Sequence, residues 1–350
     1  MKDNRDNNPG VYIAIDMMGG DFGLEITIPA VFMALSVDDR LHLILVGNQV
    51  LIEQKLTAQK LAINYERISI VNCSQTVDMD DLPSVALRKK PDSSMRVALN
   101  LVKVGKAEAC VSAGNTGALM AMARFVLKTL PGVYRPAILY SMPSKDRLVS
   151  ILDLGANVDC SAEQLFQFAV MGSALVSALG KEHPSIGLLN IGSEAIKGTE
   201  AVKAAAILIS NAPELNYFGF VEGDDLYKGT VDLIVCDGFV GNVALKVTEG
   251  FAKLILCYLK QGFTENFYSK LIGYLAKPIL NKIFHKFNPN QYNGASLLGL
   301  NGIVIKSHGS ADAKAFCNAI LVAALEAEKN VPSLIREKVA VQLAGGVKVI

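Results

Sequence analysis

The chain has 350 residues, of which 51% are hydrophobic and 19% are charged, and its formal net charge is +1. This length provides for about two domains or for one large α/β unit with a sizeable core. A near-neutral chain is a poor match to a globally basic nucleic-acid binder, so we expect no nucleic-acid partner.

The chain alternates between apolar runs that are typical of strands and helical patterns. Many runs are continuously apolar, as in strands that are covered on both faces of a parallel sheet. The predicted strands are 11–16, 41–47, 67–72, 108–113, 137–142, 149–155, 185–192, 217–223, 231–238 and 302–307. The predicted helices are 24–36, 49–61, 94–105, 116–129, 161–179, 194–210 and 241–260. This alternation predicts a doubly wound, mainly parallel α/β fold.

Five predicted strand ends carry glycine and small polar residues just before a helix. They are "DMMGGD" (16–21), "SAGNTGA" (112–118), "DLGANVD" (153–159), "NIGSEAIKGTE" (190–200) and "CDGFVGN" (236–242). One such glycine is often needed only for a tight turn. Ligands of open parallel sheets collect at the carboxyl ends of the strands, so five such ends in one chain favour a shared cleft.

The turn at 112–118 gives the sharpest indication of a ligand. Its glycines let backbone amides approach an anion, and a helix starting near Thr116 would direct N–H groups and a positive dipole end toward it. Ser112, Asn115 and Thr116 add hydroxyl and amide donors. The alternative is that Asn115 or Thr116 only caps the helix.

Other motifs disfavour several familiar site types. "MGGDFG" lacks G-x-G-x-x-G, and "GSEAIKGT" departs from a P-loop because its lysine precedes a glycine. The chain has no G-x-S-x-G elbow, which disfavours a serine hydrolase. Lys197 is either a point charge for an oxyanion or phosphate, or a solvated lysine early in a helix. His308 in "KSHGSADA" follows a strand, and Ser310 is a plausible cap for the next helix.

The six cysteines form no C-x-x-C pair, and most of them lie in apolar runs. We interpret them as small buried hydrophobic residues in a reducing compartment, and we expect no structural zinc site. The polar first ten residues lack the apolar core of a secretory signal, and no window offers about 18 strongly apolar residues in a row. These features predict a cytoplasmic protein that does not span a membrane.

Residues 251–287 differ in composition from the rest of the chain. They hold eight of the 24 aromatic residues and six lysines against one acid, Glu265. The lysines are at 253, 260, 270, 277, 282 and 286, and the apolar faces comprise 251, 254, 255, 258 and 259, then 279, 280, 283, 284 and 287. Pro278 predicts the start of a new helix or turn. We expect the amphipathic segment 250–293 to contact a membrane, a second subunit or both, and its lysines would attract an acidic carrier protein or anionic lipid.

Eight motifs carry a resemblance to a known family. They are "IAIDMMGGDFG", "SVALRKKPDSSM", "SAGNTGALM", "LDLGANVDC", "NIGSEAIKGTE", "VEGDDLYKGTVDLIVCDGFVGN", "YNGASLLGLNG" and "SHGSADAKAF". In this order they resemble the PlsX family, the acyl-acyl carrier protein:phosphate acyltransferases of bacterial phospholipid synthesis. The resemblance runs from about Val11 to Ala340.

The resemblance implies that inorganic phosphate attacks the thioester of a long-chain acyl carrier protein and gives acyl phosphate for phosphatidic acid synthesis. It implies a three-layer α/β/α fold like that of isocitrate and isopropylmalate dehydrogenases and of phosphotransacetylase. The expected unit is one two-lobed catalytic body over 1–350, usually a homodimer, without a metal or organic cofactor. A glycerol-3-phosphate acyltransferase would act downstream, and the protein would associate peripherally with the inner face of the cell membrane.

This chemistry suggests a role for each candidate residue. Ser112, Gly114, Asn115, Thr116 and Gly117 would cradle phosphate, and Lys197 would neutralise charge on phosphate or on the developing oxyanion. Asn242 would donate to the thioester oxygen, His308 would lie near the phosphate, and Asp237 would orient Lys197. The remaining candidates are substrate-binding residues: Asp16, Gly19, Gly20, Asn157 and Gly192.

Two other functions compete with acyl transfer. A nucleotide-dependent dehydrogenase could share the fold, but the dinucleotide fingerprint and an evident cluster of metal-binding carboxylates are missing from the sequence. A non-catalytic scaffold at the membrane would leave the glycine-rich strand ends unexplained.

Overall fold

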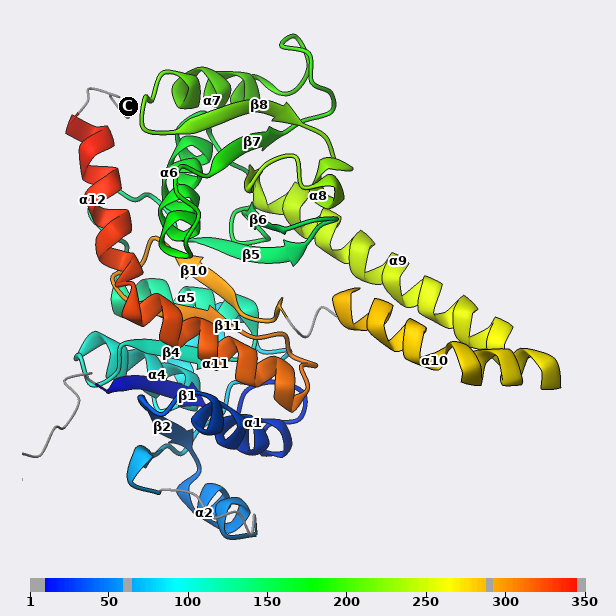
Figure 1. Cartoon of the computed structure of the whole chain (residues 1–350). Coiled ribbons are helices and arrows are strands. Elements are labelled where there is room, and N and C mark those ends of the chain that lie inside the picture. Colours follow the sequence, from blue (N-terminus) through cyan, green and yellow to red (C-terminus); the bar gives the residue numbers. More distant parts are fainter. Residues whose placement is uncertain (1–9, 59–64, 288–291, 345–350) are drawn as a thin grey trace, which may run out of the picture.

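The computed structural model describes residues 10–58, 65–287 and 292–344. Within these residues, eleven strands form one sheet in the order β3-β2-β1-β4-β11-β10-β5-β6-β9-β7-β8, with helices on both faces (Figure 1). Seven of the ten strand pairings are parallel. The predicted doubly wound, mainly parallel α/β fold is confirmed.

The elements occupy the following residues. The strands are β1 Val11–Asp16, β2 Leu41–Gly47, β3 Ile68–Asn72, β4 Ala109–Ser112, β5 Ala137–Pro143, β6 Leu148–Leu152, β7 Ser185–Leu189, β8 Asn216–Val221, β9 Leu233–Val235, β10 Ala295–Leu298 and β11 Ile303–Lys306. The helices are α1 Leu24–Val37, α2 Gln49–Ala58, α3 Pro83–Lys89, α4 Ser94–Lys103, α5 Thr116–Leu127, α6 Ala162–Ala178, α7 Glu200–Ser210, α8 Asp225–Lys228, α9 Gly238–Thr264, α10 Phe267–Phe287, α11 Ala313–Glu328 and α12 Val331–Ala344, with a 3-10 turn at Tyr65–Arg67.

Three hydrophobic clusters hold the helices on the sheet. One face packs against α3, α4, α5 and the first turns of α9. The opposite face packs against α1, α2 and α11 in one half and against α6, α7 and α12 in the other. Alternate residues of β1 enter different clusters, because successive side chains of a strand point to opposite faces: Ile13 faces α1 and α11, whereas Ala14 faces α4 and α5. The three-layer arrangement is therefore as predicted.

The two parallel halves of the sheet run in opposite directions. The three pairings β11–β10, β10–β5 and β5–β6 are antiparallel and follow one another. Strands β1, β4 and β11 therefore run opposite to β6, β9 and β7. The five glycine-rich strand ends therefore form two groups at opposite ends of the strands, whereas the sequence favoured one shared cleft.

Two local predictions were wrong, and one strand was missed. Helix α7 begins at Glu200 instead of 194, because Thr199 caps it by accepting a hydrogen bond from Val202 N. Strand β10 was not predicted, and it pairs with β5 from far away in the sequence. Pro278 lies inside α10 and starts no new element. Residues 59–61 of the helix predicted at 49–61 lie outside the described residues.

Helices α9 and α10 pack against each other as a hairpin that projects from the body of the molecule (Figure 1). Its exposed apolar side chains include Tyr258, Phe267, Tyr268, Tyr274 and Leu275. Lys253, Lys260, Lys270, Lys277 and Lys282 are also exposed. The side chains predicted on the second apolar face at 283, 284 and 287, and that of Lys286, lie outside the described ones. Among the described helices, none is both long and apolar enough to cross a membrane.

Candidate active site

The turn after β4 provides main-chain N–H groups at the start of α5. Asn115 is the N-cap: its Oδ1 accepts from Ala118 N at 2.9 Å, and its Nδ2 donates to the carbonyls of Met79 and Asp81. Its side chain is thus engaged in holding the turn, and the helix-cap alternative for Asn115 is correct. The first-turn N–H groups of Asn115, Thr116 and Gly117, with the Thr116 hydroxyl, are the donors that this turn can offer to an anion.

A buried polar pair supports this turn from below. Asp16 at the end of β1 is 1% exposed, and its Oδ2 accepts from Ser112 Oγ at 2.6 Å. Ser112 Oγ accepts in turn from Gly114 N at 3.0 Å. Burial raises the pKa of Asp16, and the hydrogen bond from Ser112 works against that rise. Asp16 and Ser112 therefore fix the conformation of the turn through buried hydrogen bonds.

The glycines at the end of β1 allow two loops to meet. A Cβ on Gly19 would lie 2.8 Å from Gly114 N, and one on Gly20 would lie 2.9 Å from the Ala113 Cβ. Gly20 also has a φ of 87°, which favours glycine. By contrast, Gly117 is needed for packing, since its Cβ would lie 2.7 Å from Pro83 Cγ. Gly19 and Gly20 thus shape the site by close approach.

The loop after β11 joins the same group of strand ends. Ser307 N donates to Ser112 O, and Asp21 N donates to Gly309 O, both at 2.9 Å. His308 Nδ1 lies 2.9 Å from Ser310 Oγ, and burial lowers the pKa of the imidazole. Ser310 is not the cap of α11, because Asp312 accepts the capping hydrogen bond from Ala315 N. The structure thus brings His308 to the loops around the 112–117 turn.

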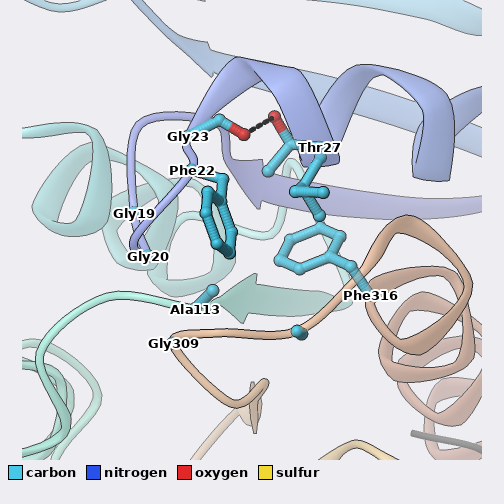
Figure 2. A pocket seen from close by; sticks show the side chains of 10 residues that line it. Gly19, Gly20, Phe22, Gly23, Thr27, Ala113, Gly309 and Phe316 are labelled. Carbon is cyan, nitrogen blue, oxygen red and sulfur yellow. Dashed lines mark hydrogen bonds between the residues drawn. The ribbon is translucent and has the colours of Figure 1, made fainter. Parts of the chain in front are cut away.

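A small pocket lies where these loops meet the start of α1. Figure 2 shows the rings of Phe22 and Phe316 with Ala113 and Gly309 beneath them, and Thr27 donating to Gly23 O. Its walls are mostly apolar. The pocket therefore borders the 112–117 turn without including its N–H groups.

The second group of strand ends is built around Asp153, after β6. Both of its carboxylate oxygens accept hydrogen bonds, Oδ1 from Ile138 N and Ala156 N, and Oδ2 from Asn157 N and Nδ2. Burial raises the pKa of Asp153. Asn157 is itself buried, and its amide also donates to Pro136 O at 2.9 Å. The predicted substrate residue Asn157 therefore supports the turn from inside the protein.

The first turn of α9 packs tightly on this support. Gly238 N donates to Asn157 O at 2.7 Å, and a Cβ on Gly241 would lie 2.0 Å from Asp153 O. Asp237 caps α9 by accepting from Val240 N at 2.8 Å. Asn242 lies beside Gly155, whose added Cβ would be 3.5 Å from Asn242 Cβ. Asn242 is thus held at the positive end of a long helix.

Lys197 lies in the loop after β7, ahead of α7. Its ammonium pairs with Glu194 Oε1 at 2.8 Å, which raises the pKa of Lys197. The side chain folds over Gly192, whose added Cβ would lie 2.4 Å from Lys197 Cδ. Strand β7 neighbours β9, so Lys197, Asp237 and Asn242 belong to one group. The 112–117 turn lies six strand positions away, or roughly 29 Å along the sheet at the usual spacing.

Helix α9 connects the two groups. Glu249 Oε1 lies 4.0 Å from His308 Nε2, and Glu249 also pairs with Lys246 at 2.9 Å. Glu249 is seven residues beyond Asn242, which is roughly 10 Å along the helix. This span of α9 therefore runs from the second group of strand ends to the first.

Four residues of the site were missed in the sequence. Asp153 and Asn293 lie in the motifs "DLGANVD" and "YNGASLLGLNG" but were not singled out, and Lys246 stands in a helix without a motif. Asn293 binds Ser307 Oγ and His308 N from beyond the hairpin. Lys306 ends an otherwise apolar strand and is 8% exposed. A lysine at the end of the buried run "GIVIK" was the one signal available.

The described residues contain no group of three or more His, Cys, Asp or Glu side chains that could hold a metal ion. The described cysteines are free thiols, and all except Cys257 are buried.

The chain is similar in sequence to a known family and to curated relatives. The family described as "Fatty acid synthesis protein" matches residues 11–334. The Phosphate acyltransferase of Legionella pneumophila (strain Paris) is 55% identical over 330 residues, which cover 94% of this chain and 96% of the relative.

Solved structures share the fold at low sequence identity. A phosphotransacetylase from Streptococcus pyogenes superposes with a TM-score of 0.61 at 20% identity, covering 91% of this chain and 94% of the other. A 4-hydroxythreonine-4-phosphate dehydrogenase from Klebsiella pneumoniae gives 0.52 at 13% identity, covering 92% and 99%. The fold is thus one that phosphotransacylases and dehydrogenases share.

The sequence relatives decide between these classes. The match over residues 11–334 and the identity to a Phosphate acyltransferase place the chain among acyltransferases that use phosphate. The chain belongs to the fatty acid synthesis protein family, and it is an enzyme of the phosphate acyltransferase class.

Proposed function

We propose that the enzyme transfers a long-chain acyl group from the thioester of acyl carrier protein to inorganic phosphate. A phosphate oxygen attacks the thioester carbonyl carbon, and the tetrahedral intermediate collapses by breaking the carbon–sulfur bond. The products are acyl phosphate and the carrier thiolate, which then takes up a proton. The observation that supports this most is the capped turn at 112–117, which presents N–H groups at a helix start in a phosphate acyltransferase.

The two groups of strand ends suit the two halves of this reaction. The turn at 115–117 offers donors to phosphate, while Asn242 offers its amide to the thioester oxygen at the start of α9. Lys197 lies in the same group of strand ends as Asn242. This position favours an interaction of the Lys197 ammonium with the developing oxyanion over one with phosphate. Helix α9 runs from Asn242 toward His308, so it lines the path along which the two reactants would approach each other.

Positioning and charge stabilisation are enough for this chemistry. Phosphate near neutral pH is already an anionic nucleophile, and the leaving thiol has a pKa of about 8.5 by analogy with cysteine. Holding two reactants in line provides about 7–11 kcal/mol, and one oxyanion donor provides about 3–4 kcal/mol. A nucleophilic serine or cysteine is therefore unnecessary.

We assign the α9–α10 hairpin to contacts outside the catalytic site. Its exposed aromatic and basic side chains suit a membrane surface and a second subunit of a homodimer. A cytoplasmic enzyme resting on the inner face of the cell membrane would release acyl phosphate close to a downstream glycerol-3-phosphate acyltransferase. One two-lobed unit over 1–350, without a cofactor, would carry out the reaction.

The decisive experiment incubates the purified enzyme with palmitoyl carrier protein and labelled phosphate. We expect a labelled lipid product that hydroxylamine destroys, because acyl phosphates react with it. Release of the free carrier should match formation of this product one to one. Carrier release without labelled product would indicate a thioesterase and would contradict the proposal. The same enzyme should give no absorbance change with NAD or NADP and 2-hydroxy acids.

A further inference from the structure

Lys306 belongs to a row of polar side chains under the 112–117 turn. It lies opposite Ser112 in the parallel pairing of β11 with β4. The pairing of β1 with β4 joins Ile15 to Val111, so Asp16 and Ser112 are the next residues of the two strands. Asp16, Ser112 and Lys306 thus occupy one face of three adjacent strands, directly at their carboxyl ends.

The ammonium of Lys306 bridges two loops of the candidate site. Nζ donates to Ala113 O at 3.3 Å and to Ser307 O. Ala113 leads into the 112–117 turn, and Ser307 precedes His308. An ammonium has three N–H donors, so two fixed carbonyls leave one donor available. This lysine therefore holds both loops and retains capacity for an anion.

Charged groups around Lys306 come from several elements. Asp16 at the end of β1 and Asp21 in the next loop favour its protonated form, whereas Lys246 on α9 opposes it. His308 follows on the same loop and is affected by Lys306 in return. Burial is the largest influence and lowers the pKa of Lys306 to about 8. A group with this pKa changes charge just above neutrality.

We propose that Lys306 is a positioning residue for phosphate, which fixes the 112–117 turn through the Ala113 carbonyl and compensates the charge of the bound anion. This proposal rests on the proposed function. It assigns the phosphate side of the reaction a buried lysine of its own, whereas Lys197 and Asn242 serve the acyl side. A phosphate that carries two negative charges would benefit most from a protonated neighbour.

Lys306→Met tests this, because methionine keeps the length of the side chain and removes the charge. We expect KM for phosphate to rise roughly tenfold or more at pH 7, with KM for the acyl carrier protein unchanged. Lys306→Arg should recover part of the loss. Lys314→Met, an exposed lysine near the start of α11, is the matched control and should behave as wild type. A KM for phosphate within twofold of wild type in Lys306→Met would overturn the proposal.

The pH profile separates positioning by charge from a merely structural role. Phosphate affinity of the wild type, measured by calorimetry without acyl donor, should fall as pH rises through about 8 and Lys306 loses its proton. After correction for the ionisation of phosphate, Lys306→Met should lack this fall. If that variant does not fold, the wild-type profile alone decides, and an affinity that stays constant from pH 7 to 9 overturns the proposal. Because calorimetry requires no acyl transfer, its result is independent of whether acyl phosphate forms.

Discussion

Asn242 and Lys197 are the two side chains that we place on the acyl side of the reaction. Removing one oxyanion donor usually lowers the rate by about 10²–10³-fold. We therefore expect Asn242→Ala and Lys197→Ala each to lower kcat/KM for acyl carrier protein, with roughly a 10²-fold loss for Asn242→Ala. Steady-state kinetics with each substrate varied in turn should show little change in KM for phosphate.

The ion pair with Glu194 supplies a control for Lys197. Glu194→Gln removes the carboxylate that holds the Lys197 ammonium at 2.8 Å and leaves the lysine in place. Activity should therefore persist in this variant. Near wild-type kcat/KM in both Lys197→Ala and Asn242→Ala would remove these residues from the mechanism.

Side chains of the site were predictable where a local pattern carried them. The turn "SAGNTGA" was correctly expected at a strand-to-helix junction, since glycine and a capping residue are local signals. The individual roles of these residues were not visible in the sequence. The side chain of Asn115 accepts from Ala118 N and donates to Met79 O and Asp81 O. Lys306 was missed because its neighbours Asp16 and Ser112 lie on other strands, which only the sheet brings together.

Asp237, at the start of α9, is either a helix cap or a charged residue of the site, and two variants distinguish these roles. Its Oδ1 accepts from Val240 N, and an N-cap replaced by alanine usually costs about 1 kcal/mol. Asp237→Ala should therefore lower the melting temperature by about 1–2 °C. Asp237→Asn should keep both stability and activity, because asparagine caps equally well.

Thermal unfolding together with acyl phosphate assays measures both effects. An Asp237→Asn variant with wild-type melting temperature but strongly reduced kcat/KM would show that the carboxylate charge is required. That outcome would contradict a purely capping role.

Elements were predictable from apolar runs, but their partners were not. The run "AILYSM" was correctly expected as a strand, yet β5 pairs with β10 from residues 295–298. The antiparallel strands β10 and β5 lie between β11 and β6, so the two halves of the sheet run in opposite directions. Hydrophobic periodicity contains no information about pairing between strands that are distant in the sequence. The separation of the strand ends into two groups therefore could not be predicted from the sequence, although each strand end was identified there.

The whole molecule combines a covered sheet with one uncovered projection. Most helices bury an apolar face against the sheet, whereas the α9–α10 hairpin extends beyond it and keeps aromatic side chains exposed (Figure 1). Since α9 begins at Gly238, carries Asn242 in its first turns and passes His308 at Glu249 before it projects, one helix connects the candidate site to the exposed hairpin. Anything that docks on the hairpin is thus joined to Asn242 by a continuous helix.

The exposed lysines of the hairpin lead to a prediction for membrane association. Anionic lipid attracts clustered lysines with about 1 kcal/mol each near the surface, and salt screens this attraction. We expect the wild type to float with liposomes that contain anionic lipid at low salt and to be released by high salt. Replacing Lys270, Lys277 and Lys282 by glutamate should abolish flotation. The same change at Lys103, Lys106 and Lys128, which are exposed on α4, the following loop and the end of α5, alters net charge equally and should leave flotation intact.

Light scattering on the same samples reports the oligomeric state, so that loss of a dimer is distinguished from loss of lipid contact. A hairpin variant that floats as well as the wild type would show that these lysines do not bind the membrane.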